Sequence, residues 1–378
     1  MTDGAPINPS MLRWARQSAG YTVEAVAKHV GVKVETVAKW EAGEVPITYG
    51  RVDALCAFFK RPSAILYLRE PPTEDATLPP DFRAEHAGPT PGLILQVRRA
   101  KERRDLALEL AADLAEVPVR FAFETTQDED PESVGARLRE LLVVEEPTEG
   151  WGRDAQGYQA LAARKFAAEA AGVLVFQAPA TEIGEASGFS IYFDPFPLAV
   201  LRASDNPRRR SFTLLHELAH LGLRGGGICD LHDDSVEFFC NRVAAAALMA
   251  PDAVRRELRR QNVSGTPNAG ELLSLAKTFS VSEQAMMLRL VALQCVPLDA
   301  YLARHAQFAM RESAAEGGGT HHVAMLSRVG EHFARLVLEA YYRGIITGHR
   351  ASTSLGTNFA NLEKIAEEIN NKELRRAS

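Results

Sequence analysis

The sequence predicts an α+β protein that is mainly helical, and three observations carry this prediction. Residues 1–70 hold a series of short helical segments, of which the first three end at Gly20, Gly31 and Gly43. Residues 172–203 hold three short runs rich in Val, Ile and Phe, which are typical of strands. Helical periodicity then dominates the rest of the chain. We therefore expect a mainly helical protein with a small sheet of about three strands.

Length and composition place the chain among globular proteins of several domains. Its 378 residues exceed one ordinary domain, and 46% hydrophobic residues allow a buried core. The net charge of −6 argues against wrapping nucleic acid over the whole surface but permits a local basic face. The four cysteines form no C-x-x-C pair, and no signal or membrane-spanning pattern is found. We expect a cytoplasmic protein with reduced thiols and no membrane contact.

The order of the expected elements divides the chain into four parts. Residues 1–70 form a helical domain, and the prolines of "REPPTEDATLPPDFR" mark a linker over 71–90. A domain with the three strands follows over 91–300, and a helical region over 301–378. The expected helices before the strands are 8–20, 22–31, 33–43, 48–60, 61–68, 92–116, 131–142 and 155–171, and the expected strands are 172–178, 188–193 and 197–203.

The stretch "RRRSFTLLHELAHLGLRGGG", residues 208–227, places two histidines and a glutamate in an apolar helix. His216 and His220 are four residues apart, so a helix presents both imidazoles on one face. Zinc binds nitrogen ligands in tetrahedral geometry, and a catalytic site keeps one position for water. Glu217 could take a proton from that water. The motif therefore predicts a zinc site with Glu217 as its catalytic base.

A third ligand should come from a separately anchored element. Glu237 lies on the next apolar helix, 234–250, which Pro251 ends. A carboxylate embedded in a core needs a partner. Asn241, one turn after Glu237, could accept the outer N–H of a liganding histidine and so fix its tautomer. The neighbours of Glu237 that we expect in the core are Phe238, Phe239, Val243, Ala244 and Ala247.

These residues together resemble a known family. "RSFTLLHELAHL" with "VEFFCNRVAAAALMAP" resembles the ImmA/IrrE zinc metallopeptidases, and "LPPDFR" and "GVLVFQAPATEIGEASGFSIYFDPFPLAVL" suit the region before the active helix. The resemblance spans about residues 79–300 and implies a zincin-like peptidase domain. It makes His216, His220 and Glu237 zinc ligands and Glu217 the general base. Asn241 stands where related zincins often carry an aspartate.

Peptide hydrolysis is the chemistry that this resemblance implies. Zinc lowers the pKa of its bound water from 15.7 toward about 7, and Glu217 passes the proton to the leaving amine. A further donor should stabilise the oxyanion. His232, Tyr192 and Arg210 are candidates for it, and each is also explained as a surface or packing residue.

The amino-terminal stretch "YTVEAVAKHVGVKVETVAKWEAGEVPIT" resembles the helix-turn-helix of the XRE, or phage-repressor-like, family. Ala27, Gly31, Val37 and Glu41 match that pattern, whereas Val23 stands where the family commonly has a glutamine. The second helix of such a pair enters the major groove of DNA. The residues expected to face DNA are Lys33, Glu35, Thr36 and Lys39, and those expected in the core are Val26, Val30, Val37 and Trp40.

The charge of this region supports DNA binding only weakly. Residues 7–60 hold seven Lys/Arg and five Asp/Glu, a net charge of +2. Because affinity for DNA grows with the number of phosphates neutralised, a single copy would bind weakly unless it forms a homodimer. A protein-docking module with the same fold is the alternative, since fold does not fix function.

The carboxyl-terminal stretch "GEHFARLVLEAYYRGIITGHRASTSLG" looks like the helical tail of many ImmA/IrrE proteins. Phe333, Leu336, Val337 and Ala340 recur at helical spacing and predict a buried stripe. Packing is the expected role, and regulatory contact or dimerisation is the alternative. The adjacent His321 and His322 do not face one ion on a helix, and no solenoid-type repeat is found.

The sequence thus predicts a zinc-dependent endopeptidase fused to a DNA-binding module. It would act as a regulatory switch that cleaves a protein partner, for example a transcriptional repressor. The alternative is a helix-turn-helix transcriptional regulator in which the zinc fold is a sensor or an inactive scaffold. In a third interpretation, the peptidase is active but residues 1–70 only dock a protein.

Overall fold

The computed structural model describes residues 4–72, 90–142, 157–184, 186–224, 234–311 and 321–377. The chain divides into two compact units. The first comprises Met1–Arg99 with Thr181–Gly184, and the second comprises Ala100–Ala180 with Glu185–Ser378. The finer division into four parts, with boundaries at residues 70, 90 and 300, stays a prediction.

The first unit begins with five short helical segments whose ends follow from their capping residues. Thr22 accepts a hydrogen bond from the backbone N–H of Ala25, and Gly31 ends that helix in the left-handed conformation. Gly43 ends the next helix in the same way. The segments are α1 (Pro9–Ser18), α2 (Val23–Val30), α3 (Val34–Ala42), α4 (Tyr49–Phe59) and the 3-10 helix η1 (Ser63–Tyr67). These helices confirm the expected N-terminal bundle.

A small apolar core holds this bundle together. Val26, Val37 and Trp40 are buried in it as expected, whereas Val30 is only partly buried at its margin. Glu41 is also buried, because Arg16 donates to both of its carboxylate oxygens at 2.6 and 2.9 Å. This ion pair joins α1 to α3 and was not foreseen from the sequence.

The second unit is built around a three-stranded mixed sheet with the order β1-β3-β2. β1 (Leu174–Ala178) runs parallel to β3 (Leu198–Arg202), and β2 (Gly188–Ile191) runs antiparallel to β3 at the edge. The strands fall within the three expected ranges, and each is two residues shorter than its range. The fold class is therefore the predicted one, mainly helical with a small sheet.

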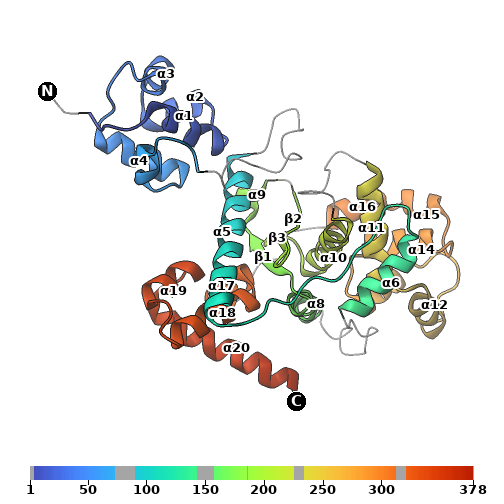
Figure 1. Cartoon of the computed structure of the whole chain (residues 1–378). Coiled ribbons are helices and arrows are strands. Elements are labelled where there is room, and N and C mark those ends of the chain that lie inside the picture. Colours follow the sequence, from blue (N-terminus) through green and yellow to red (C-terminus); the bar gives the residue numbers. More distant parts are fainter. Residues whose placement is uncertain are drawn as a thin grey trace. The chain divides into compact units, whose positions relative to one another are not determined.

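Helices cover both faces of this sheet (Figure 1). Val175 and Ala199 share one face with Ser190 of β2, according to the register. This face packs against α8 (Tyr158–Ala170) and α10 (Pro207–Leu223), which contribute to the same core. On the other face, Phe176 meets Phe333 of α18 (Glu331–Tyr342) edge to face.

The remaining helices extend this core on both sides. The helix α5 (Pro91–Asp113) contains the boundary between the two units, and the short α9 (Ala180–Ile183) falls at the second boundary. The others are α6 (Pro131–Leu141), α11 (Asp234–Leu248), α12 (Pro251–Arg260), α13 (Ala269–Phe279), α14 (Glu283–Ala292), α15 (Leu298–Leu302), α16 (His305–Arg311), α17 (His321–Val329), α19 (Gly348–Leu355), the 3-10 helix η4 (Phe359–Asn361) and α20 (Leu362–Ala377). Among the described residues, none of these helices is long and apolar enough to cross a membrane.

The close packing of α6 against α11 depends on a glycine. A Cβ atom at Gly135 would lie 2.5 Å from Cβ of Ala246 and 2.9 Å from the backbone N of Ala247. At the point of closest approach, the alanines of α11 therefore pack against Gly135 of α6, which has no side chain. This contact fixes the helix that carries Glu237.

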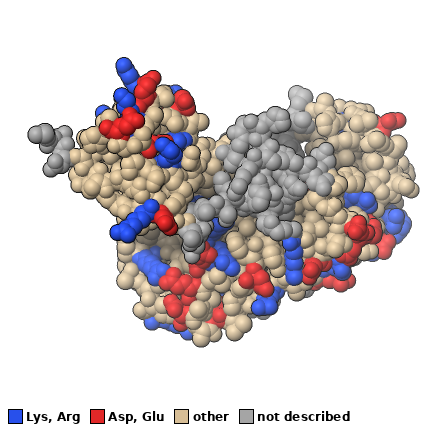
Figure 2. Space-filling model, turned by 45° about the horizontal axis from the view of Figure 1, so that its top comes forward, with Lys and Arg blue, Asp and Glu red and all other residues tan. Residues whose placement is uncertain are grey.

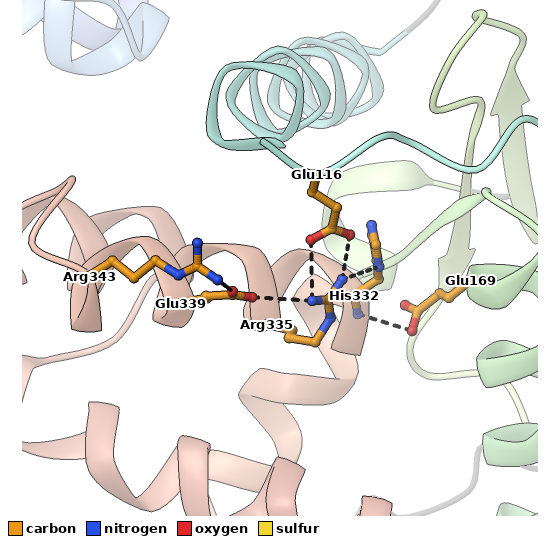
Figure 3. Close-up of polar contacts among 6 residues, drawn as sticks. All are labelled: Glu116, Glu169, His332, Arg335, Glu339 and Arg343. Carbon is orange, nitrogen blue, oxygen red and sulfur yellow. Dashed lines mark hydrogen bonds and ion pairs between the residues drawn. The ribbon is translucent and has the colours of Figure 1, made fainter. Parts of the chain in front are cut away.

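Polar contacts, including those to the buried Glu169, anchor the carboxyl-terminal helices to the rest of the second unit (Figure 3). Glu169 at the end of α8 accepts hydrogen bonds from the backbone N–H groups of Glu331 and His332, which open α18. A carboxylate is favoured there because the first N–H groups of a helix lack partners. Arg335 of α18 donates to Glu116 at 2.7 Å. The helical tail is thus an integral part of this unit.

Candidate metal centre and DNA-facing helix

The helix α10 carries three of the predicted site residues, and its local sequence explains its bounds. Asn206 caps it by accepting a hydrogen bond from the backbone N–H of Arg208, and Pro207 takes the first position, where no N–H is needed. Leu214 and Leu218 bury its inner face. Arg224 ends it in the left-handed conformation, and the glycine-rich stretch that follows lies outside the described residues.

The two histidines and Glu237 converge as the spacing predicts. Nε2 of His216 lies 2.9 Å from Nε2 of His220. The carboxylate of Glu237 on α11 lies 3.3 Å from Nε2 of His216 and 3.1 Å from Nε2 of His220. Among the described residues, no other group of three or more His, Cys, Asp or Glu side chains converges in this way.

These separations fit a tetrahedral zinc ion. Zinc–ligand bonds of about 2.0–2.1 Å imply about 3.3 Å between neighbouring ligand atoms of a tetrahedron. The two Nε2 atoms lie 2.9 Å apart, and each has one oxygen of the Glu237 carboxylate nearby, Oε2 at 3.3 Å from His216 and Oε1 at 3.1 Å from His220, so the cluster has about this size. Two imidazole nitrogens and one carboxylate oxygen are also a donor set that catalytic zinc accepts. The residues present therefore fit the metal.

The electrostatics of the cluster favour a cation between these groups. Burial opposes the charge on Glu237, but hydrogen bonds with His216 and His220 outweigh it and hold the pKa of this carboxyl far below its usual range. Burial likewise opposes the charge on His216, yet contacts with Glu237 and Glu217 raise the pKa of this imidazole. The two carboxylates thus stabilise positive charge at the imidazoles.

Glu217 lies on the same helix, on the side that faces the sheet. Its side chain is buried, and the hydroxyl of Ser190 on β2 donates to its Oε2 at 2.7 Å. A Cβ atom at Gly188 would lie 3.3 Å from Oε1 of Glu217 and 2.8 Å from the carbonyl oxygen of Val200. Gly188 and Ser190 of β2 therefore lie directly against the Glu217 carboxylate.

Ser190 was missed in the sequence, although a signal for it existed. It lies between Phe189 and Ile191, which are buried on the other face of β2. Strict alternation along the strand places Ser190 toward the helix that follows the sheet. A hydroxyl between apolar residues of a strand, in the sheet that precedes the helix with the buried glutamate, is the pattern that could have identified it.

Asn241 lies one turn after Glu237, as expected, but its side chain is exposed. It contributes to raising the pKa of His216, as the last of several causes. Nδ1 of His216 and Nδ1 of His220 have no hydrogen-bond partner among the described residues. The proposed role of Asn241 in fixing a tautomer stays a prediction.

One expected core residue next to the site is exposed. Phe238 is 64% exposed and lies under the guanidinium of Arg242, 5.8 Å from the ring centre. The expectation that it joins the core was wrong because α11 turns Phe238, Asn241 and Arg242 to the same outer side. Phe239, Val243, Ala244 and Ala247 are buried as expected.

The candidates for oxyanion stabilisation have other partners or lie outside the described residues. Arg210 is buried and donates to Oε1 of Gln177 at 2.7 Å. Tyr192 is partly buried, and Arg224 lies over its ring at 5.4 Å. His232 lies outside the described residues. The structure thus favours the packing interpretation for Arg210.

In the first unit, the residues expected to face DNA lie on α3 or directly before it. Lys33 is the extended residue before the helix, and Lys33, Glu35 and Lys39 are exposed. Thr36 is half-buried between them. On the face drawn in Figure 2, Lys and Arg are interspersed with Asp and Glu among the described residues.

Fold and site define a protein that joins a helix-turn-helix bundle to a domain with a His-Glu cluster. Comparison with known families gives these parts their names. Residues 168–291 match the model of the IrrE N-terminal-like domain, a peptidase M78 model. Residues 11–64 match the model of a helix-turn-helix domain. The matches confirm the resemblance to an IrrE-type peptidase domain and to a helix-turn-helix, and the chain thus combines a peptidase-type domain with a DNA-binding-type domain. A search of curated proteins finds no match.

Proposed function

We propose that this protein is a zinc-dependent endopeptidase of the H-E-x-x-H type that is linked to a DNA-binding module. The observation that carries the proposal is the convergence of His216, His220 and Glu237 within 3.3 Å of one another, with Glu217 on the next position of the same helix. A protein partner, for example a transcriptional repressor, is the proposed substrate. The cytoplasm is the proposed location, because an operator would be met there.

His216, His220 and Glu237 would hold the zinc ion. When bound, zinc polarises the scissile carbonyl and makes its water a nucleophile near neutral pH. The buried carboxylate of Glu217 takes the proton of the attacking water and delivers it to the leaving amine. Ser190 donates to Oε2 of Glu217 and so leaves Oε1 for this proton. The side chains of the site thus supply both the base and its orientation.

Replacement of the base tests this function. Glu217→Gln keeps the shape of the side chain but cannot accept a proton, so cleavage should fall by at least about a thousandfold while zinc stays bound. The measurement pairs zinc content per chain with cleavage of candidate repressors, with and without operator DNA. Glu271→Gln on α13 is a matched control, since Glu271 belongs to the cap of its own helix.

Undiminished cleavage by Glu217→Gln would contradict the mechanism. The second candidate function is a helix-turn-helix transcriptional regulator in which the zinc fold is a sensor or an inactive scaffold. The buried Nδ1 atoms of His216 and His220 favour this candidate, because among the described residues neither has the hydrogen-bond acceptor that commonly orients a ligating histidine. Normal zinc content without cleavage of any candidate repressor, in a chain that binds operator DNA, would support it. The proposed homodimer is tested separately by sedimentation.

A further inference from the structure

The carboxyl-terminal helices repeat the geometry of the amino-terminal helix-turn-helix. Thr22 caps the eight-residue helix α2, and Thr347 caps the eight-residue helix α19 in the same way. Gly31 ends α2 with φ 66° and ψ 42°, and Gly356 ends α19 with φ 64° and ψ 39°. The corresponding residues are 325 positions apart in both cases.

The turn after each helix is also the same. The backbone N–H of Val32 donates to the carbonyl of Ala27 at 3.0 Å, and that of Thr357 donates to Ser352 at 2.9 Å. The next residue is extended in both places, with ψ 152° at Lys33 and ψ 160° at Asn358. A helical segment then begins, α3 in one case and η4 continuing into α20 in the other.

Burial follows the same register through the two motifs. Val26 and Ala27 correspond to Ala351 and Ser352, and all four are buried. In the second helix, the buried pair Val37 and Trp40 corresponds to the buried pair Leu362 and Ile365, with exposed residues at the equivalent positions between them. The two motifs therefore bury side chains at equivalent positions.

The helix before each pair corresponds as well. α1 ends near Gly20, which has φ 74°, and α18 ends near Gly344, which also has φ 74°. The segment from this glycine to the capping threonine is one residue longer in the carboxyl-terminal motif. The family match covers residues 11–64 only, so the second motif is not part of it.

We propose that α18, α19 and α20 form a second helix-turn-helix and that it binds duplex DNA. The positions that correspond to Lys33, Glu35, Thr36 and Lys39 hold Asn358, Ala360, Asn361 and Lys364. Asn358, Ala360 and Lys364 are exposed, and Asn361 is half-buried, as Thr36 is. Asparagine amides can pair with adenine edges, and a lysine can meet a phosphate or a guanine.

The local charge agrees with a nucleic-acid partner. Residues 16–39 hold four Lys/Arg and two Asp/Glu, a net of +2, and the corresponding residues 341–364 hold three and one, again +2. Arg350 and Arg343 are engaged by Glu109 and Glu339. Lys364 is therefore the cation of this stretch that is best placed for contact with DNA. Phe359, 60% exposed, can contact a thymine methyl group from the start of the helix.

Two DNA-binding motifs in one chain would offset the weak DNA affinity expected of a single motif. Each motif alone neutralises few phosphates, and affinity rises with the number neutralised. When one motif is bound, the other is held near the same DNA, so its effective concentration for binding is raised. This proposal does not depend on peptidase activity or on the first motif binding DNA.

The test uses the full chain and a fluorescein-labelled random duplex of about 30 base pairs, with anisotropy measured across a salt series. Lys364→Glu should weaken binding roughly tenfold near 0.1 M salt and reduce the salt slope by about one. Lys277→Glu on α13 gives the same change of net charge away from the motif and should have little effect. Thermal unfolding by circular dichroism checks that each variant folds, and Lys364→Gln replaces Lys364→Glu if it does not.

The decisive background is Lys33→Glu with Lys39→Glu, which disables the first motif. We expect residual DNA binding in that chain, and we expect added Lys364→Glu to remove it. No residual binding in that background would overturn the proposal, as would Lys364→Glu that behaves like Lys277→Glu. If Lys364→Glu behaves like Lys277→Glu, a protein is the better candidate for the partner of the second motif.

Discussion

At the scale of single residues, the contact between Ser190 and Glu217 gives the first prediction. Ser190→Ala removes the hydroxyl that donates to Oε2 at 2.7 Å, so the carboxylate loses its fixed orientation. A hydrogen bond to a charged group contributes about 1.5–3 kcal/mol, which corresponds to a fall in kcat of roughly ten- to a hundredfold. Zinc content should not change. Ser274→Ala on the exposed side of α13 is the control, and equal kcat in both variants would contradict the prediction.

His332 predicts a pH dependence of stability. Burial, followed by the neighbouring guanidinium of Arg335, lowers the pKa of His332 to about 4. The unfolded chain binds this proton near pH 6.5, so its contribution to stability is complete above that pH and is lost as the pH falls toward 4. The free energy of unfolding should therefore fall by about 2 kcal/mol between pH 7 and pH 5 because of this residue.

Urea unfolding at a series of pH values measures this contribution. His332→Gln cannot titrate, so its free energy of unfolding should vary less over the same range. The exposed His349 provides the control variant His349→Gln, which should keep the full pH dependence. If the free energy of unfolding of His332→Gln changed with pH as steeply as that of the unchanged chain, His332 would not be a neutral imidazole in the folded protein.

At the scale of elements, the contact of α6 with α11 predicts a coupling between packing and metal binding. Gly135→Ala puts a Cβ atom 2.5 Å from Cβ of Ala246, so the helices must separate. Overpacking of this kind costs about 1–3 kcal/mol of stability. Because α11 carries Glu237, zinc affinity should fall as well. Calorimetry of unfolding and a zinc titration measure the two effects.

A matched glycine in another helix separates packing from helix propensity. Gly270 lies in the first turn of α13, and a Cβ atom there would meet only Oδ1 of Asn268, at 3.4 Å. Gly270→Ala should therefore leave stability and zinc affinity unchanged or slightly increased. A loss of stability equal to that of Gly135→Ala would show that the close approach of α6 and α11 is not the cause.

The elements themselves were largely predictable from the sequence, because glycine, proline and capping residues mark their ends. The convergence of His216 and His220 was also expected from their spacing, since four residues along a helix return to the same face, and Glu237 was expected from its place on the next apolar helix. Ser190 was not foreseen, because its partner lies in another element. The second helix-turn-helix was hidden for a different reason. Over α2, α3 and the turn between them, only Thr22, Gly31 and Lys39 recur as identical residues in the later motif.

Outcomes that depend on neighbours across the fold are the ones that a single sequence leaves open. Phe238 is expected in the core because it is apolar, but the rotation of α11 turns it outward. Glu41 matches a family pattern, yet its burial depends on Arg16, which lies on another helix. Hydrophobicity alone does not determine which side of a helix meets its neighbour.

At the scale of the whole molecule, removal of the metal should affect one unit and spare the other. Zinc that binds only the folded state stabilises it by an amount that grows with the logarithm of its concentration over Kd. Chelation should therefore lower the unfolding temperature of the unit that contains His216, and Glu237→Ala should abolish this shift. DNA binding by the first unit should be unaffected. A shift of equal size in Glu237→Ala would place the metal elsewhere.

Arg164 limits where the chain can be truncated without loss of folding. It is fully buried in α8, and it donates to the carbonyl oxygens of Phe279 and Ser280, which close α13. Burial lowers the pKa of this guanidinium to about 9. A fragment that began at residue 168, where the family match begins, would discard this side chain and leave two carbonyls without donors. The smallest piece that folds alone should therefore start upstream of Tyr158, and truncation experiments should respect that limit.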